Sequence, residues 1–339
     1  MQDRIIKETV SEKQVLKRLN WLRGLFAILI VIGHCSMEFE HEILPLYVIH
    51  KSDMISVSFF FILSGWGLSY NYQHRTDYLK GFILNKPVKL LLIALICGIV
   101  DLLVSRCVGA NNITWKSIFT FNWYVYEMIY YYLVFYIAYR FIRNKRLRLI
   151  CVLAFSLLCS IITVMLSNKY NTFWTHAFHF SSFGFVWGII LHDYYDVFKM
   201  AGNMTNRWRS SILLVLLAMG GCVCMVMPSG SFIGGCLLHN LVANCVITLL
   251  AIWAYYVDYT KMPIVQYLTN ISTEIYLYQF TVLRALKECY AKMNHTIDLT
   301  YVFWVLLFTI LLAVIMHKLN SIVLKHIPGM HIRTEGKQM

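Results

Sequence analysis

The sequence predicts an all-α, polytopic membrane protein with about ten transmembrane helices and with both termini in the cytoplasm. Three observations predict this class: the composition, the lengths of the apolar runs and the distribution of positive charge. Of the 339 residues, 59% are hydrophobic and 14% are charged, whereas soluble domains are about 45–50% apolar and about 25% charged. The mean hydropathy of +0.60 points the same way.

Ten stretches are apolar enough to cross a bilayer, for which a helix needs about 20 mostly apolar residues. No connection between them is long enough for a second domain, so we expect one membrane domain over 1–339, with a cytoplasmic N-terminal segment (1–18) and a cytoplasmic tail (324–339). The ninth stretch is the most polar. In order, the expected spans are Leu19–Met37, Ile55–Tyr72, Val88–Val104, Phe121–Phe141, Leu149–Leu166, Phe173–Leu191, Ile212–Met227, Phe232–Tyr256, Ile264–Leu286 and Tyr301–Val323.

The positive residues predict the orientation, because cytoplasmic loops are enriched in Lys and Arg. With a cytoplasmic N-terminus, 22 Lys and Arg residues fall on the cytoplasmic side and 7 on the other, while Arg23 lies within a span. An even number of spans then places both termini in the cytoplasm. The net charge of +13 is therefore explained by topology, and we expect no nucleic-acid partner.

The cysteines and histidines give no sign of a metal site. Ten cysteines are scattered through apolar runs, where we interpret them as small packing residues and expect no disulfide framework. His176, His179 and His239 also lack the spacing of metal ligands, so we expect no bound metal. The first apolar run has no small-residue cleavage signature, which favours a retained helix over a signal peptide.

Arg23 and His34 are ionisable residues inside the first apolar run. Such groups are costly in hydrocarbon and usually mark a pathway or a site. Eleven residues make three helical turns plus ~20°, so both side chains share one face and lie ~16 Å apart along the axis. Arg23 then lies near the cytoplasmic interface and His34 in the outer half of the membrane. Each also has a simpler interpretation, as a snorkelling arginine or as a histidine hydrogen-bonded between helices.

Four stretches, in order, carry a resemblance to a known family. They are RGLFAILIVIGH (23–34), SVSFFFILSGWGLSY (56–70), FNWYVYEMIYYYLVF (121–135) and NISTEIYLYQF (270–280). The first resembles the basic residue, ten intervening positions and histidine of the acyltransferase-3 family of integral-membrane acyltransferases. The second has Phe60, Ser64 and Gly65 in register with that family's second helix. With ten spans and cytoplasmic termini, the resemblance extends over nearly the whole chain.

The resemblance implies transfer of an acyl group, typically acetyl, from cytoplasmic acyl-coenzyme A to a hydroxyl of a cell-envelope or secreted carbohydrate or lipid. It implies a protein of a bacterial plasma membrane whose partners are membrane lipid, acyl-CoA and a carbohydrate or glycolipid acceptor. His34 is then catalytic, either as the base that takes the hydroxyl proton or as the carrier of the acyl group. Arg23, with Lys80 and Lys86 where the family usually has arginines, would bind the phosphates of the donor.

Two further positions differ from what the family usually has. Gln279 stands in the place of a histidine, and it can form hydrogen bonds but cannot titrate. Glu127 stands where many relatives have an apolar residue. As a second catalytic candidate it either orients His34 or contacts the acceptor, and the alternative is a carboxylate solvated at a cavity mouth.

The remaining polar and aromatic candidates each allow two interpretations. Ser64 and Gly65 either permit close helix packing or bend the backbone near the site. Trp123, Tyr124, Tyr130 and Tyr276 either line a cavity or belong to the aromatic belt at a membrane interface. Asp53 and Asp101 lie at the outer ends of spans, where we interpret both as solvated.

The competing class is a transporter or exporter of a polysaccharide or lipid precursor, for which ten spans with intramembrane charge are equally suitable. Transporters often have inverted repeats and paired broken helices. The sequence shows neither, although the Gly-rich segment 219–235 could contain a break. Binding or slow hydrolysis of acetyl-CoA by the purified protein would favour the enzyme.

Overall fold

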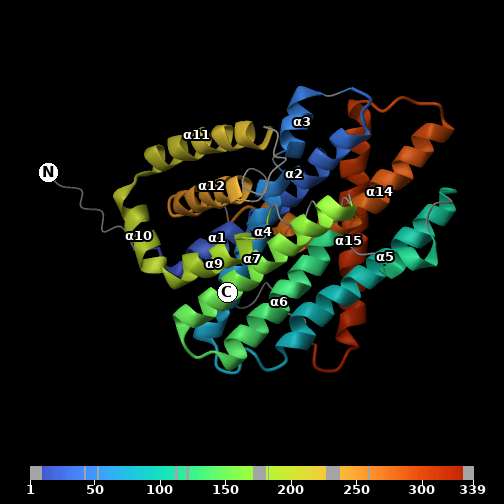
Figure 1. The fold of residues 1–339 in the computed structure, drawn as a ribbon. Coiled ribbons are helices and arrows are strands. Elements are labelled where there is room, and N and C mark those ends of the chain that lie inside the picture. Colours follow the sequence, from blue (N-terminus) through green and yellow to red (C-terminus); the bar gives the residue numbers. More distant parts are fainter. Residues whose placement is uncertain are drawn as a thin grey trace.

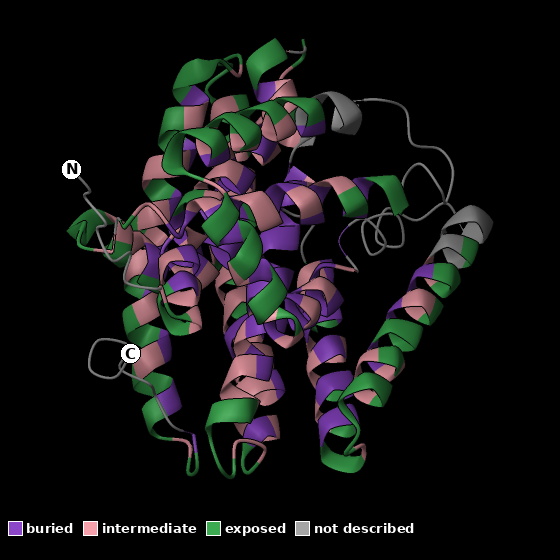
Figure 2. Cartoon of the chain, turned by 90° about the vertical axis from the view of Figure 1, so that its left-hand side faces the viewer, coloured by how far each residue is buried: buried purple, intermediate pink, exposed green. Residues whose placement is uncertain are grey.

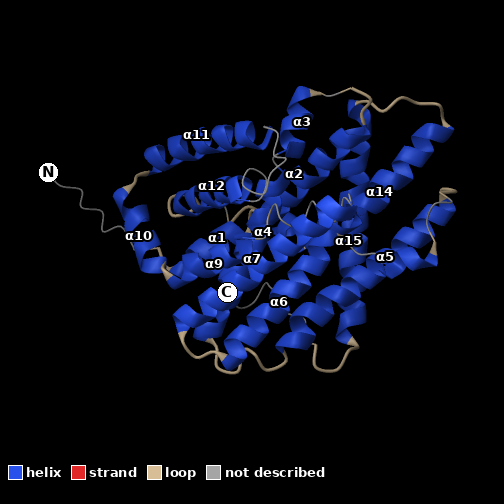
Figure 3. Ribbon diagram, in the orientation of Figure 1, coloured by secondary structure: helices blue, strands red, loops and turns tan. Residues whose placement is uncertain are grey.

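The computed structural model describes residues 10–41, 43–51, 53–110, 114–119, 122–170, 181, 183–226, 237–258 and 260–330. Within these ranges the chain is helical and contains no strand (Figure 3). The α-helices are α1 (Glu12–Asn20), α2 (Arg23–Cys35), α3 (Leu44–Lys51), α4 (Asp53–His74), α5 (Lys89–Cys107), α6 (Trp123–Phe141), α7 (Lys145–Tyr170), α9 (Phe183–Asp193), α10 (Tyr195–Met204), α11 (Arg207–Val226), α12 (His239–Trp253), α13 (Pro263–Asn270), α14 (Ser272–Lys292) and α15 (Leu299–Lys325). Shorter turns are η1 (Ser36–Glu38), the π-helical η2 (Leu84–Val88) and η3 (Trp115–Phe119).

Each of the ten predicted stretches contains a helix of the described part of the chain. Four helical segments there are long and apolar enough to cross a membrane, which agrees with an integral membrane protein. They are Leu44–His74, Leu84–Cys107, Lys145–Thr163 and Leu299–Lys325, with Phe183–Asp193 and His239–Trp253 as shorter apolar helices. The total of ten spans and the orientation of the termini stay predictions.

The outward faces of the bundle are rich in large apolar side chains, as expected where lipid replaces water. Figure 2 shows buried residues concentrated on the inward faces of the helices and exposed residues on the outer faces. Exposed apolar residues on α7, α11 and α15 include Ile150, Leu158, Leu213, Leu216, Leu311 and Ile315.

Helix α4 runs through the middle of the bundle and packs most extensively on α9. Gly65, Gly184 and Gly188 allow the two backbones to approach closely. A Cβ at Gly65 would lie 2.0 Å from the carbonyl oxygen of Phe185, and one at Gly188 would lie 2.1 Å from that of Ile62. The close-packing interpretation of Gly65 is therefore confirmed, and α4 continues as unbroken helix through Ser64 and Gly65.

Two helix breaks meet at one point of the fold. The first expected span is not continuous, because α1 ends at Asn20 and α2 begins at Arg23, and the ninth is divided at Ile271 between α13 and α14. The Thr269 hydroxyl donates a hydrogen bond to the Trp21 carbonyl over 2.7 Å. The missing side chain of Gly24 lets the two segments approach, since a Cβ there would lie 2.9 Å from the Thr269 backbone nitrogen.

Beyond this junction, α2 and α14 run side by side through the bundle (Figure 1). Helix α14 also packs on α15 and α5, while α3 and α4 cover another side of α2. Helix α2 thus packs against elements from both the beginning and the end of the sequence.

Candidate functional site

Arg23 begins α2 at the junction of the two helix breaks. Its Nη1 donates a hydrogen bond to Asn20 Oδ1 over 3.3 Å, and its Nη2 donates one to Thr273 Oγ1 over 3.2 Å. The side chain is half-buried and lies within electrostatic range of the hydroxyls of Tyr124 and Tyr132 on α6. The guanidinium is therefore held inside the bundle, beside the N-termini of α2 and α14, where the helix dipoles also favour an anion.

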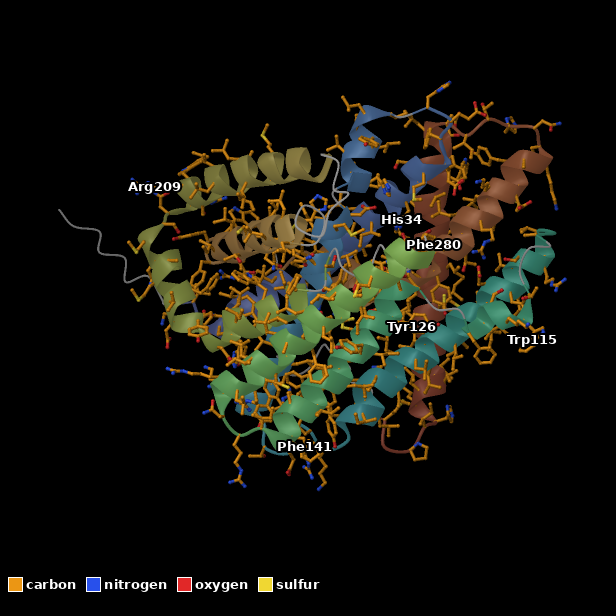
Figure 4. All side chains as sticks on the ribbon, in the orientation of Figure 1. His34, Trp115, Tyr126, Phe141, Arg209 and Phe280 are labelled. Atoms are coloured by element: carbon orange, nitrogen blue, oxygen red, sulfur yellow. The ribbon has the colours of Figure 1, made fainter. Side chains whose placement is uncertain are left out.

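His34 lies on the last turn of α2, and because α2 is continuous it shares a helix face with Arg23, as predicted. Figure 4 shows it between α2 and α14, beside Phe280, with the two ring centres 4.7 Å apart. His34 Nδ1 is 3.0 Å from Gln279 Oε1. Gln279, which is fully buried, also donates from Nε2 to the Tyr276 carbonyl over 2.9 Å.

The second bond of Gln279 determines the tautomer of His34. A backbone carbonyl can only accept a hydrogen bond, so the amide NH₂ of Gln279 must face Tyr276 and its oxygen must face the imidazole. The amide oxygen also only accepts, and therefore Nδ1 of His34 carries the proton. In the neutral ring the basic lone pair is then on Nε2. Gln279, which stands where the resemblance would place a histidine, thus forms the contact that orients His34.

Aromatic side chains from α4, α6 and α14 gather at one place inside the bundle. Tyr124 and Tyr276 have ring centres 4.8 Å apart, and Phe60 lies 6.3 Å from Tyr124 and 6.2 Å from Tyr276. The Tyr276 hydroxyl donates to Asn122 Oδ1 over 3.4 Å. These rings pack between helices, and their role as lining of a site stays a prediction. Trp123 is buried beside Tyr124.

Other predicted residues lie farther from this group. The Tyr130 hydroxyl donates to the carbonyl of Phe155 on α7 and so faces away from α2. Ser64 lies within hydrogen-bonding range of Tyr132. Lys80 is exposed in the turn after α4, and Lys86 is half-buried in η2, which packs on α5 and α6. The two lysines thus lie on different elements from the α2–α14 junction that holds Arg23.

Glu127 is fully buried in α6, so the alternative of a carboxylate solvated at a cavity mouth is wrong. Within the described residues neither carboxyl oxygen has a hydrogen-bond partner. The titratable groups that act electrostatically on His34 are Asp53 and His50, and Glu127 is not among them. Glu127 lies instead within electrostatic range of Tyr124 and Tyr131.

Asp53 is not solvated, contrary to the sequence-based interpretation. It is 3% exposed, and its Oδ2 lies 3.2 Å from His50 Nδ1. Sequence reasoning did not consider His50 and misinterpreted Asp53, although their i, i+3 spacing was a usable signal. Asp101 is also not simply solvated, because it accepts two hydrogen bonds from Arg284 Nη1, at 2.8 and 2.7 Å.

His176 and His179 lie outside the described residues, and His239 is buried at the start of α12. Among the described residues no group of three or more His, Cys, Asp or Glu side chains is arranged to hold a metal ion.

The family model described as "Acyltransferase domain", that of the acyltransferase-3 proteins, matches residues 16–318. No curated protein and no solved structure matches the chain.

Proposed function

The chain belongs to the acyltransferase-3 family of membrane acyltransferases, since the family model spans nearly all of it, and on that premise we propose the reaction. The protein transfers an acyl group, typically acetyl, from cytoplasmic acyl-CoA to a hydroxyl of a cell-envelope or secreted carbohydrate or lipid. It acts as an O-acetyltransferase in the plasma membrane of a bacterium, in contact with membrane lipid.

One observation supports this proposal above the others: His34 is held by Gln279 with its proton on Nδ1. A neutral imidazole with its lone pair on Nε2 is suited to both roles that acyl transfer requires. It can take the proton of a hydroxyl or attack the thioester carbonyl itself. A transporter has no evident need for a histidine whose tautomer is fixed in this way.

The donor enters from the Arg23 end of α2 in this proposal. Coenzyme A combines an anionic nucleotide with a long, thin pantetheine arm, so it needs a cation at one end of the site and a narrow path to the other. Arg23 supplies the cation, and charge-assisted bonds to phosphate are among the stronger hydrogen bonds. Lys80 and Lys86 attract the nucleotide from the α4–α5 connection. The ~16 Å between Arg23 and His34 is then the path of the arm.

The acceptor approaches from the His34 end. Tyr124, Tyr276 and Trp123 offer aromatic faces and hydroxyl groups, which suit a sugar or the head group of a glycolipid. Glu127, buried with no hydrogen-bond partner in the described part of the chain, provides a polar contact for the acceptor beside Tyr124. Its role is separate from that of His34, because Glu127 is not among the groups that act electrostatically on His34.

The test measures CoA release from acetyl-CoA by the protein in nanodiscs, together with the variants His34→Ala and His34→Gln. The wild type should hydrolyse acetyl-CoA slowly without an acceptor, and both variants should insert and fold normally but lose this activity. Size-exclusion profiles control for folding. Wild-type protein that neither binds nor hydrolyses acetyl-CoA would contradict the proposal and favour the transporter, while a His34 variant with near wild-type turnover would remove the role of His34.

A further inference from the structure

A second histidine with a hydrogen-bond acceptor at Nδ1 lies beside the first. His50 is the penultimate residue of α3 and Asp53 is the first residue of α4, and the carboxylate Oδ2 of Asp53 lies 3.2 Å from His50 Nδ1. The His50 side chain is 29% exposed, whereas that of Asp53 is 4% exposed. The pair thus joins a buried carboxylate to an imidazole that reaches the surface at this end of the bundle.

The position of Asp53 is fixed by the backbone of α2. A Cβ at Gly33 would lie 2.2 Å from Asp53 Oδ1 and 2.5 Å from Oδ2, so only glycine leaves room for the carboxylate there. Gly33 immediately precedes His34 in the same helical turn. The absence of a side chain at Gly33 therefore lets the Asp53 carboxylate pack against α2, one residue before His34.

The two imidazoles lie close to each other. Their ring centres are 6.4 Å apart with the planes tilted by 54°, and each has an oxygen acceptor on Nδ1, from Gln279 for His34 and from Asp53 for His50. A hydroxyl between two such rings can approach both within the ~3–3.5 Å that a reacting pair requires. The other titratable side chains around Asp53 are Cys35 and Tyr276.

The chemistry of the two acceptors differs, and this difference suggests a division of labour. A carboxylate stabilises the imidazolium that forms when a histidine takes a proton, as in hydrolase triads. A neutral amide fixes the tautomer but adds no negative charge. His50 is therefore the better proton acceptor, and His34 is the better neutral nucleophile.

On the basis of the proposed function, we propose that His50 is a second catalytic residue, the general base for the acceptor hydroxyl, oriented by Asp53 as a positioning residue, while His34 carries the acyl group. In the first step the lone pair of His34 Nε2 attacks the thioester carbonyl. A C–N bond forms, the C–S bond breaks, and CoA leaves as a thiolate that takes a proton from water.

In the second step the acceptor oxygen attacks the acyl carbon while its proton passes to His50 Nε2. The C–O bond forms, the C–N bond to His34 breaks, and the bonding electrons return to Nε2, which restores the neutral imidazole. His50 is then an imidazolium beside Asp53 and releases its proton to water. The sum is an ester, CoA and unchanged protein.

The test needs only acetyl-CoA, water and hydroxylamine as probes. Attack of water on an acyl-histidine requires the general base, whereas hydroxylamine attacks acyl groups without one. His50→Ala in nanodiscs should release about one equivalent of CoA in a rapid burst, the sign of acyl-enzyme accumulation. Its steady-state hydrolysis should fall ~10²-fold or more, the usual contribution of a general base. Hydroxylamine should restore turnover and yield acetohydroxamate.

Asp53→Asn, which keeps the packing against Gly33, should show the same pattern with a smaller loss, about tenfold, and the same rescue by hydroxylamine. A purely structural role would not give rescue by a nucleophile. His326→Ala is the matched control, because His326 is exposed after the end of α15 and its Nδ1 donates to the Ile322 carbonyl of the last helical turn. It should leave both phases unchanged.

Two outcomes overturn the inference while leaving the proposed function intact. Near wild-type steady-state hydrolysis by His50→Ala would show that His50 is not the base. Equal loss of the burst and the steady state, without rescue, would show that His50 serves the donor step or the fold. Failure of the wild type to use acetyl-CoA would instead contradict the proposed function itself.

Discussion

Replacement of Gln279 by leucine tests whether the amide fixes the tautomer of His34. Leucine keeps most of the volume of this fully buried residue but removes the acceptor that lies 3.0 Å from His34 Nδ1. The Nδ1–H group then has no partner, or the proton moves to Nε2 and the nucleophilic lone pair is lost.

The magnitude follows from the cost of leaving one buried donor unsatisfied, about 1–3 kcal/mol. At about 1.4 kcal/mol per factor of ten, this corresponds to a loss of about 5- to 150-fold in kcat. The Michaelis constant for acetyl-CoA should change little, because the nucleotide binds near Arg23, three helical turns away. Gln279→His should stay within a few-fold of wild type, since a neutral imidazole can also accept a hydrogen bond from Nδ1.

The assay is steady-state CoA release in nanodiscs at a fixed salt concentration. Gln266→Leu is the matched control, because Gln266 is exposed on α13, and it should have wild-type kcat. A Gln279→Leu protein with wild-type kcat would refute the reasoning, since the tautomer would then be set by something else. Complete loss of activity in Gln279→His would show that the amide makes a further essential bond.

Three further predictions concern other parts of the chain. Arg23→Ala should raise the Michaelis constant for acetyl-CoA about ten- to hundredfold, as expected for the loss of ~1.5–3 kcal/mol, with partial recovery in Arg23→Lys; a defect confined to the acceptor would oppose the donor role. Gly65→Ala should lower the melting temperature through an overpacking cost of at least about 1–3 kcal/mol. Gly67→Ala should leave it unchanged, because no atom lies within 4 Å of a Cβ at that position. Equal melting temperatures of the two variants would contradict the close approach of α4 and α9. Hydrogen bonds from Thr260 hold the pKa of the Asp258 carboxyl below its ordinary value. The carboxylate should therefore stabilise the fold at neutral pH and lose that effect as the pH falls through its lowered pKa. The difference in melting temperature between wild type and Asp258→Asn should shrink on acidification, and a difference that stays constant would contradict this prediction.

Much of the fold could be predicted because apolar length and composition carry the signal directly. Every expected span contains helix in the described residues, and Arg23 and His34 do lie on one helix face. The breaks at Trp21 and Ile271 could not be predicted, because they depend on a contact between residues 248 positions apart in the sequence. Local propensity contains no information about such a contact.

The site shows the same division. The family motifs indicated His34 and Gln279 separately, but the bond between them depends on how α2 packs against α14. Asp53 was misinterpreted because its position at the end of a span suggested water, while Gly33 in a neighbouring helix creates the space that buries it. The surroundings of Glu127 could not be predicted either, because a carboxyl within a predicted span gives no indication of which side chains pack around it.

The contact between Arg23 and Thr273 joins residues 250 positions apart, and this has a consequence for biogenesis. At about 5–20 residues per second, a ribosome needs roughly 13–50 s to make the intervening chain. During that time α2 has left the ribosome, yet the partners of Arg23 and His34 on α14 do not exist. Ionisable groups without partners are costly in lipid, so the nascent α2 should stay beside the insertion machinery and enter the bilayer only when α14 arrives.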